Sequence, residues 1–444
     1  MGKRAFACTC AVCLVASWPA APAAAQTPLP LPPLPAISQS AALTLDDAVR
    51  AALDHNLTLV AERYLVSIAR ARVVTAKLRP NPVLTFNAML PDATVFAENI
   101  SPREQVFRAD VLIEGGAKRE RRIEVADAAQ SVAELQLLNT MRSIALDVES
   151  AFVDVVLAKE NVALARGSLQ ALDALVQVNL QRVRTGDLAQ VELARSRLAA
   201  LQFRNDVRQQ QSKLTIAQNR LKTLVGRTVV ESLDVTGDLR RHTAPVDLEV
   251  VRRNALRLRP DLEALRRDQA RSTADVRLQI AQGKADYTIA GELHHQRQAT
   301  PPLDNTGFLY GLYLSVPLPL FNRNQGEVER ARQETRQIEA RIRALEADVS
   351  NEVQAAYETY VASRDVVDTI EAQMLTPARE VRATTEYSYR RGEASFIEFL
   401  DAIRAFNETM QSYNEARAAY ARSLYTLDSV SGVSVTGVAA GVKP

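Results

Sequence analysis

Two stretches of this chain combine residue types that could sort ions: residues 183–200 (VRTGDLAQVELARSRLAA) and 389–406 (YRRGEASFIEFLDAIRAF). Each has the cation-rich end of one expected helix, then a glycine, then a second helix that opens with an acid. The two glycines, Gly186 and Gly392, lie 206 residues apart, and most of the sequence around them also occurs twice. Glycine allows the left-handed backbone that reverses a chain after a helix. The pattern predicts a duplicated protein with two equivalent helix tips.

Glu398 and Asp401 are two acids of the second stretch that could act together. They lie three positions apart, so on a helix they share one face. Carboxylates gathered on one face attract cations and repel anions. The helix dipole also favours acids in a first turn, which explains Glu398 without any ion. It explains Asp401 less well, because Asp401 lies nine residues past Gly392.

Signals for a metal site or a catalytic site are weak. His294 and His295 fall near the expected loop of a hairpin, and a solvated loop explains them better than a ligand pair. The chain has only four His, and its three Cys all lie within the first 13 residues, too few soft ligands for a metal relay. Gly115 and Gly116 lack the following lysine-serine or lysine-threonine pair of a phosphate loop. No catalytic constellation is recognisable, so we expect no enzyme, no cofactor and no bound metal.

The N-terminus has the parts of a cleaved secretory signal, residues 1–25: a basic start, an apolar core and the small residues Ala23–Ala25. Its removal would take Lys3 and Arg4, leaving 52 basic against 52 acidic residues. This neutral balance argues against nucleic acid as a partner. No later stretch reaches the ~18 consecutive apolar residues of a spanning helix. If the protein crosses a bilayer, it does so as β-strands.

The remaining sequence divides into two similar halves. We expect a Pro-rich linker at 26–42, a first repeat at 43–226, a connector at 227–247, a second repeat at 248–432 and a flexible tail at 433–444. Each repeat reads as a helix, a β-hairpin, a long helix and a second helix. The expected hairpins span 83–113 and 285–316.

The helices of the first repeat are expected at 45–79, 116–184 and 187–225. Thr44 is the expected N-cap of the first helix, and Gly167 the one break in the second. At 1.5 Å per residue the second helix would span ~100 Å. The two shorter helices, stacked end to end, would run beside this long helix.

The long helix of the second repeat is expected at 326–390, with a kink at Pro377. Apolar residues recur along it at the spacing of three and four that is typical of packed helices. The predicted seam is Ile338, Ile342, Leu345, Val349, Val353, Ala356, Tyr360, Val367, Ile370 and Met374.

Alternation in the two hairpins predicts strands with one apolar and one mixed face. In the first hairpin the apolar face would hold Leu84, Phe86, Ala88 and Leu90, and on the return strand Phe107, Ala109, Val111 and Ile113. In the second it would hold Tyr287, Ile289, Gly291 and Leu293, then Phe308, Tyr310, Leu312, Leu314 and Val316. Strands of about ten residues with this pattern suit a transmembrane hairpin, although a soluble hairpin on a helical protein would fit equally well.

Two motifs resemble a known family: 316–326 (VPLPLFNRNQG) and 389–404 (YRRGEASFIEFLDAIR). They are similar to those of TolC-type outer-membrane efflux proteins, most of all the outer-membrane component of cobalt–zinc–cadmium type heavy-metal cation exporters. The resemblance covers about residues 43–432. It implies a mainly α fold with a transmembrane β-hairpin pair and an internal two-fold repeat. Trimerisation would complete a long coiled-coil α-barrel and a 12-stranded β-barrel.

The resemblance also implies roles for residues of the helix tips, which in this family close the tube. The acids that ring the constriction would be Glu398 and Asp401, with Glu192 equivalent to Glu398 in the first copy. Tyr389 would tie neighbouring tips together. The chain departs from some members in having Ala394 where they have a basic residue, which Arg390 and Arg391 would have to replace.

The function implied is that of a passive outer-membrane exit duct of a tripartite, RND-type efflux pump for heavy-metal cations, gated at its periplasmic tips. Its partners would be two further copies in a homotrimer, a periplasmic adaptor (membrane fusion) protein, an inner-membrane transporter and outer-membrane lipid. The helical portion would lie in the periplasm. Two alternatives stay open: a channel of the same fold for drug efflux or type I protein secretion, and a periplasmic coiled-coil adaptor without a pore.

Overall fold

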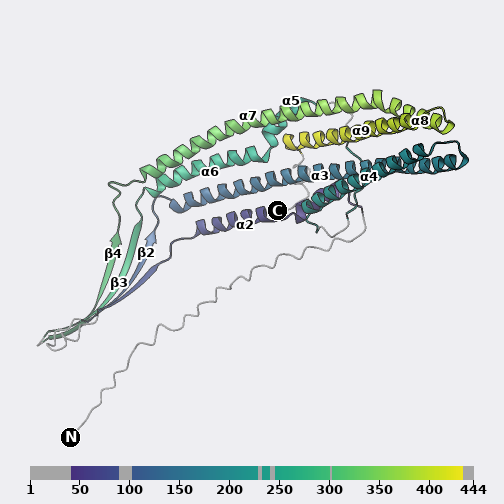
Figure 1. The fold of residues 1–444 in the computed structure, drawn as a ribbon. Helices are drawn as coiled ribbons and strands as arrows, with labels where there is room; N and C mark the ends of the chain where they lie inside the picture. The colour runs from purple at the N-terminus through teal and green to yellow at the C-terminus, as the bar shows by residue number, and fades with distance from the viewer. Residues whose placement is uncertain (1–41, 90–102, 229–232, 241–245, 301–302, 434–444) are drawn as a thin grey trace, which may run out of the picture. The chain divides into compact units, whose positions relative to one another are not determined.

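The computed structural model describes residues 42–89, 103–228, 233–240, 246–300 and 303–433, all of which belong to one compact unit. The expected signal segment, most of the Pro-rich linker, Leu90 and nearly all of the tail lie outside these residues. Most of the described residues are helical. The strands form one four-stranded sheet, which extends from one end of the long helices (Figure 1). Within the described ranges, no helix combines the length and apolar character that a membrane crossing requires.

The first repeat contains α1 (Leu45–His55), α2 (Leu57–Lys77), β1 (Val83–Met89), β2 (Arg103–Ile113), α3 (Lys118–Thr185) and α4 (Gln190–Leu224). Thr44 caps α1, since its side chain accepts a hydrogen bond from the Asp47 N–H. The prediction of one helix over 45–79 is wrong, because the chain breaks at Asn56. The Asn56 Oδ1 accepts from the Thr58 N–H at 2.9 Å, and its Nδ2 donates to the Leu224 carbonyl at 2.9 Å. Asn56 thus starts α2 and holds it against the end of α4.

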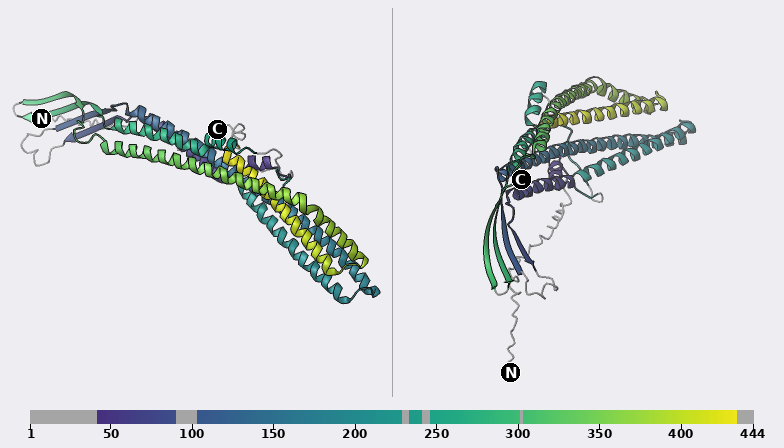
Figure 2. Two further views of the ribbon diagram at one scale, coloured as in Figure 1. Left: turned by 90° about the horizontal axis from the view of Figure 1, so that it is seen from above. Right: turned by 90° about the vertical axis from the view of Figure 1, so that its left-hand side faces the viewer.

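Helix α3 runs for 68 residues without interruption, so the predicted break at Gly167 is also wrong. A glycine inside a helix costs about 1 kcal/mol relative to alanine. Ala165 and Ser168 beside it are buried against neighbouring helices, and this packing offsets the cost. Helices α2, α4, α6 and α9 all contact α3, which is therefore the axis of the helical part (Figures 1 and 2).

The second repeat contains α5 (Leu248–Leu258), α6 (Pro260–Gln282), β3 (Tyr287–Thr300), β4 (Leu303–Ser315), α7 (Gln325–Thr369), the π-helical turn η2 (Ile370–Met374), α8 (Leu375–Arg391) and α9 (Phe396–Ser431). It repeats the break of the first half, since Arg259 lies between α5 and α6 as Asn56 lies between α1 and α2. A matching clamp spans each break. Arg63 donates to the Leu53 carbonyl at 2.9 Å, and Arg266 to the Leu256 carbonyl at 3.3 Å.

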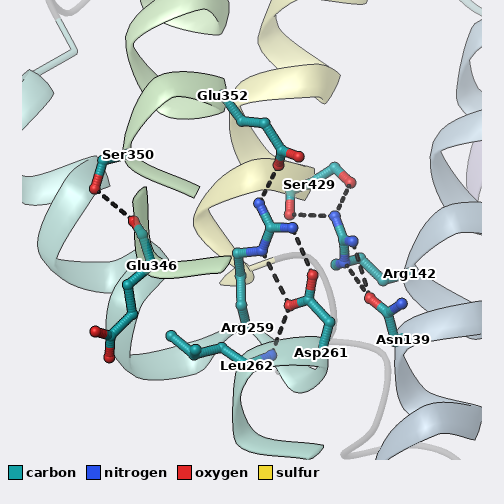
Figure 3. A network of polar contacts seen from close by, with 9 residues as sticks. All are labelled: Asn139, Arg142, Arg259, Asp261, Leu262, Glu346, Ser350, Glu352 and Ser429. Atoms are coloured by element: carbon teal, nitrogen blue, oxygen red, sulfur yellow. Dashed lines mark hydrogen bonds and ion pairs between the residues drawn. The ribbon is translucent and has the colours of Figure 1, made fainter. Parts of the chain in front are cut away.

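A group of polar contacts lies at the α5–α6 break, with the buried Arg259 on one side and Arg142 on the other (Figure 3). The Arg259 guanidinium pairs with Asp261 at 2.6 Å and with Glu352 of α7. Arg142 of α3 lies beside it and donates to the Ser429 carbonyl of α9 at 3.1 Å. Burial and the neighbouring Arg259 charge lower the pKa of Arg142. The Arg259 ion pairs hold the α5–α6 break against α7, and the Arg142 bond beside them joins α3 to α9.

Pro377 disturbs its helix, although not as a simple kink. Proline removes a backbone donor and clashes with the carbonyl four residues before it, here that of Gln373. The helix responds with the π turn η2 over that residue. A π turn holds an extra residue and so shifts the phase of the seam. Ile370 and Leu375 are buried while Met374 is exposed, and Met374 is the one wrong member of the predicted seam.

The two hairpins pair through β2 and β3 into one antiparallel sheet of order β1-β2-β3-β4. Register pairs join apolar positions to apolar positions, for example Phe86 to Phe107 and Leu293 to Tyr310. The predicted faces of both hairpins are therefore correct for the described strands. Gly115 lies so close to the Ala285 carbonyl that a Cβ there would be 2.0 Å from its oxygen, so glycine is what lets β2 turn into α3 beside the second hairpin.

Three buried clusters hold the helices together. One joins α1, the centre of α3, the end of α4 and the connector. A second joins α5, α7 and α9. The third lies at the tips of α3, α4, α8 and α9, and positions the candidate site.

Candidate functional site: the helix tips

Both helix tips reverse through the same backbone turn. Gly186 and Gly392 are left-handed, with φ of +86° and +84°. The N–H of the residue after each glycine donates to the carbonyl five residues before it, at 2.8 Å in the first tip and 2.9 Å in the second. The glycine N–H bonds the carbonyl three residues before it, at 3.2 and 3.0 Å. This Schellman pattern satisfies the last helix carbonyls and requires glycine or a strained residue.

Tyr389 lies in the interior of the tip cluster, with 4% of its surface exposed. Its hydroxyl donates to the Asn179 Oδ1 of α3 at 3.0 Å. Its ring stacks on Phe399 at 5.4 Å and meets the edge of Phe396 at 6.1 Å. Burial raises the pKa of the Tyr389 phenol, so it is a neutral donor. Tyr389 therefore joins the second-repeat tip to the first-repeat long helix within one chain.

Glu398 is exposed and caps α9. Its carboxylate accepts from the Ser395 N–H at 2.6 Å, while the Ser395 hydroxyl accepts from the Glu398 N–H at 3.2 Å. These reciprocal bonds form a capping box. The hydrogen bond from the Ser395 backbone lowers the pKa of Glu398, which stays ionised. Glu398 thus has the helix-capping role that the sequence left open, and its charge still faces solvent.

Asp401 and Glu192 differ in their surroundings. Asp401 is exposed, and within the part of the chain that the structure describes it has no hydrogen-bond or ion-pair partner. Glu192 lies in the first turn of α4 and pairs with Arg195 at 2.8 Å. Arg195 is the first-tip equivalent of Asp401, since both lie nine residues past their glycine. At these matched positions the first tip presents an acid paired with Arg195, and the second tip presents two acids, Glu398 and Asp401.

The two basic residues before Gly392, Arg390 and Arg391, contact different partners. Arg390 pairs with Glu386 at 2.6 Å, and Arg391 lies over the Tyr387 ring at 4.5 Å. Both contacts are within α8, so neither side chain fills the place of a basic residue at Ala394. Arg182 of α3 comes near instead, since its Nη2 would lie 3.3 Å from a Cβ at Gly392.

Sequence reasoning missed Asn179, Phe399 and Arg182 in this site. Asn179 continues the buried spacing of Leu172 and Leu175 on α3, and a polar residue in such a series is the signal that could have found it. Its Nδ2 is a buried nitrogen that has no hydrogen-bond partner in the described structure. Tyr389 thus bonds to an Asn179 side chain whose oxygen has a hydrogen-bond partner but whose nitrogen has none in the described structure.

His294 and His295 lie inside strand β3, so the loop interpretation is wrong. His295 packs on the Phe308 ring at 4.8 Å, on the apolar face. His294 is on the opposite face, with its Nε2 3.7 Å from the Glu104 carboxylate. The two side chains point away from each other and cannot share one metal ion. Across the described ranges, no three His, Cys, Asp or Glu side chains gather where they could hold one.

Comparison with known proteins gives independent information on this architecture. The family model described as outer membrane efflux protein matches residues 251–433, which is almost the whole second repeat. The cobalt-zinc-cadmium resistance protein CzcC of Cupriavidus metallidurans is 23% identical over 390 residues, which are 88% of this chain and 90% of CzcC.

Two solved structures are similar over most of the chain. The outer-membrane channel OprN has a TM-score of 0.69 at 19% identity, covering 87% of this chain and 89% of OprN. The open state of the MtrE outer membrane channel of Neisseria gonorrhoeae has a TM-score of 0.71 at 17% identity, covering 87% and 88%. The family resemblance inferred from the sequence is thus confirmed: this chain has the fold of these channels, and its second repeat has the sequence signature of outer membrane efflux proteins.

Proposed function

We propose that this protein is an outer-membrane exit duct of a tripartite efflux pump, made of three copies of the chain. The observation that carries the proposal is the inverted burial of its sheet. Apolar side chains on one face are open to the surroundings, with Leu84 76%, Tyr310 82% and Leu312 90% exposed. Charged side chains on the other face, such as Arg108 and Asp110, are half-buried among one another. A lipid-facing exterior and a polar interior would have this pattern.

The edges of the sheet support the trimer. Within the described strands, β1 pairs only with β2 and β4 only with β3, so each outer strand has one unused side. Unpaired strand edges are not tolerated in a bilayer. Three copies joined edge to edge would close twelve strands into one barrel and leave none unpaired.

The tips would be the gate of this duct. The bond from Tyr389 to Asn179 holds the second tip to the first-repeat helix, and releasing it would let the tip hairpin swing about Gly392. Glu398 and Asp401, repeated in three copies, would place six carboxylates at the opening, with Glu192 nearby but paired. Such a ring would favour cations without being a stoichiometric binding site.

Heavy-metal cations are the cargo that we propose, because of the likeness to CzcC, whose name states cobalt, zinc and cadmium resistance. The duct itself would be passive. A periplasmic adaptor would grip the tips, and an inner-membrane transporter would supply the energy.

The decisive experiment is reconstitution of the purified protein in a planar bilayer, together with native mass spectrometry in detergent. A duct gives discrete conductance steps and a three-chain mass, whereas a rod or adaptor gives no steps. A matched pair of variants sharpens the test. Phe86→Lys places a charge on the apolar face at a cost of about 2–4 kcal/mol and should abolish insertion. Asn87→Lys, its neighbour on the polar face, should insert normally.

Cargo needs a separate experiment in cells. A deletion strain should lose survival on cobalt, zinc or cadmium and regain it from a plasmid copy. A strain that keeps its metal tolerance but loses drug tolerance, or stops secreting a protein, would assign the same duct to a different pump.

A further inference from the structure

The polar face of the sheet carries a second charged assembly, far from the helix tips. Its members come from three strands: Glu104, Arg108 and Asp110 of β2, Glu292 and His294 of β3, and Tyr313 of β4. The helix α3 separates this sheet from the tips by about 100 Å, at 1.5 Å per residue. The gate therefore does not account for these residues.

Arg108 is the centre of the assembly. Its Nε and Nη2 donate to the Asp110 carboxylate at 3.1 and 2.8 Å. Its Cζ lies 5.2 Å from the centre of the Tyr313 ring. Arg108 and Glu292 are register partners on adjacent strands, and the Tyr313 hydroxyl donates to Glu292 at 3.3 Å. The Arg108 guanidinium is thus held by Asp110, and the Glu292 carboxylate is held by Tyr313.

Gly311 makes room for this arrangement. It is the register partner of Glu292 on β4, and a Cβ at Gly311 would lie 2.7–3.0 Å from the Tyr313 ring and hydroxyl. Tyr313 therefore lies across the glycine to reach Glu292. A side chain at position 311 would displace the tyrosine and loosen Glu292.

The charges of the assembly do not balance, because three carboxylates of the described strands stand against one guanidinium. Arg108 pairs with Asp110 through hydrogen bonds from two of its nitrogens and also lies opposite Glu292 in the strand register. Glu104 faces the His294 Nε2 at 3.7 Å, which is within ion-pair distance but too long for a hydrogen bond. That buried nitrogen has no hydrogen-bond partner in the described structure. Both glutamates are half-buried on the polar face.

We propose that Glu104 and Glu292 determine ion specificity in the sheet, forming a second cation-selective filter independent of the gate. The inference rests on the proposed function, in which the polar face lines the lumen. Each copy would contribute three carboxylates and one guanidinium, so three copies would place a net excess of six negative charges around the pore. Their ligands are hydrated permeating cations, both monovalent and divalent, with Arg108 limiting the net negative charge.

The test is the cation-to-anion permeability ratio, taken from reversal potentials across a planar bilayer at ~0.1 M salt, where the Debye length is about 10 Å. Glu292→Gln and Glu104→Gln should each lower the ratio by about twofold, and both together by about fourfold. Arg108→Gln should raise it. All the shifts should shrink at high salt, since screening removes them.

Two further variants separate an effect of charge from an effect of altered structure. Glu292→Asp keeps the charge and should keep the ratio. Thr85→Glu adds an acid to the same cross-strand row, next to Arg108, and should raise the ratio. The effects of the sheet variants and of a Glu398→Gln, Asp401→Asn tip variant on the logarithm of the ratio should add, because the sites are distant.

The outcomes separate the inference from the function. Channels that conduct normally but have the same ratio in Glu292→Gln, Glu104→Gln and Thr85→Glu would overturn the filter and leave the duct intact. Failure of the unaltered protein to conduct would overturn the duct, and the filter with it. Opposite shifts for the glutamate and arginine variants would support the filter.

Discussion

The two helix tips have the same backbone conformation but different side chains. Gly186 and Gly392 have the same left-handed conformation and the same pair of turn hydrogen bonds. Around them the side chains differ at matched positions. The first tip has Val183, Ala189 and Arg195, where the second has Tyr389, Ser395 and Asp401. The two tips thus share the turn, and the distinctive side chains lie on the second one.

From this difference we propose that the second tip is the working one. A capping box orders its start and a buried tyrosine ties it to α3. Its acids Glu398 and Asp401 face solvent without a basic partner among the described residues. At the first tip no side chain caps α4, and Arg195 neutralises Glu192. The family model matches residues 251–433, which include the second tip. The first tip then serves as a support, and variants at matched positions can test this division.

The largest effect is expected at Tyr389. Tyr389→Phe leaves the buried Asn179 with neither its oxygen nor its nitrogen bonded, at a cost of about 1–3 kcal/mol in unfolding free energy. It should also raise the resting conductance, if this bond holds the tip shut. Tyr389→Phe with Asn179→Leu should recover most of the stability but not the closed state. Tyr387→Phe, an exposed tyrosine two residues away, is the control and should change neither quantity.

Alanine at the two turn glycines should give the next largest effect. A left-handed alanine costs about 1 kcal/mol at either tip. At Gly186 a Cβ meets nothing within 4 Å, whereas at Gly392 it would meet the Arg182 Nη2 at 3.3 Å. Thermal unfolding should therefore show Gly392→Ala as the more damaging change. Equal losses would mean that Arg182 moves aside freely.

Exchange of the helix caps should come third. Ser395→Ala removes the capping box and should destabilise α9 by about 1 kcal/mol. The reverse change in the first tip, Ala189→Ser, should stabilise α4 by a smaller amount, because Glu192 is already paired with Arg195. Hydrogen exchange of the first turns of α4 and α9 measures both effects. Absence of any gain at α4 would indicate that its start is ordered by packing alone.

Charge changes should alter ion passage more than stability. Glu398→Ala with Asp401→Ala should lower cation selectivity several-fold and weaken block by trivalent cations. Glu192→Ala in the first tip should have little effect, since Arg195 already compensates that charge. Bilayer recordings compare the two. Unchanged block in the double variant would refute the assignment of these acids to the gate.

The smallest effect is expected from lowering the pH. The folded-state pKa of Glu398 lies below its ordinary value of 4.5, because the ionised carboxylate accepts the Ser395 hydrogen bond. Its contribution to stability is therefore complete above the unfolded-state pKa and is lost as pH falls through the folded-state pKa. Unfolding temperatures of the unaltered protein and Glu398→Gln should converge between about pH 5 and about pH 3. A constant difference would show that Glu398 acts only through its shape.

Several features of the fold and site were predictable because they depend on local pattern. The faces of both hairpins followed from alternation, the tip turns from glycine, and most of the α7 seam from its three-and-four spacing. Two of the errors share a cause, because the break at Asn56 and the unbroken helix at Gly167 depend on neighbouring helices. The π turn before Pro377 is instead a response of the helix to the proline itself. Propensity along the chain does not report which neighbour will satisfy a carbonyl or bury a glycine.

The sequence by itself determined the duplication, the order of elements, the two glycine turns and the apolar face of each hairpin, because backbone geometry and side-chain periodicity encode these locally. Only the tertiary structure decided that Asn179 receives the Tyr389 hydroxyl, that Arg195 cancels one acid while Asp401 has no such partner, and that Tyr313 crosses Gly311 to hold Glu292. These contacts join residues distant in the chain or depend on side-chain direction. Their partners are therefore set by how helices and strands pack, and no spacing in the sequence specifies that.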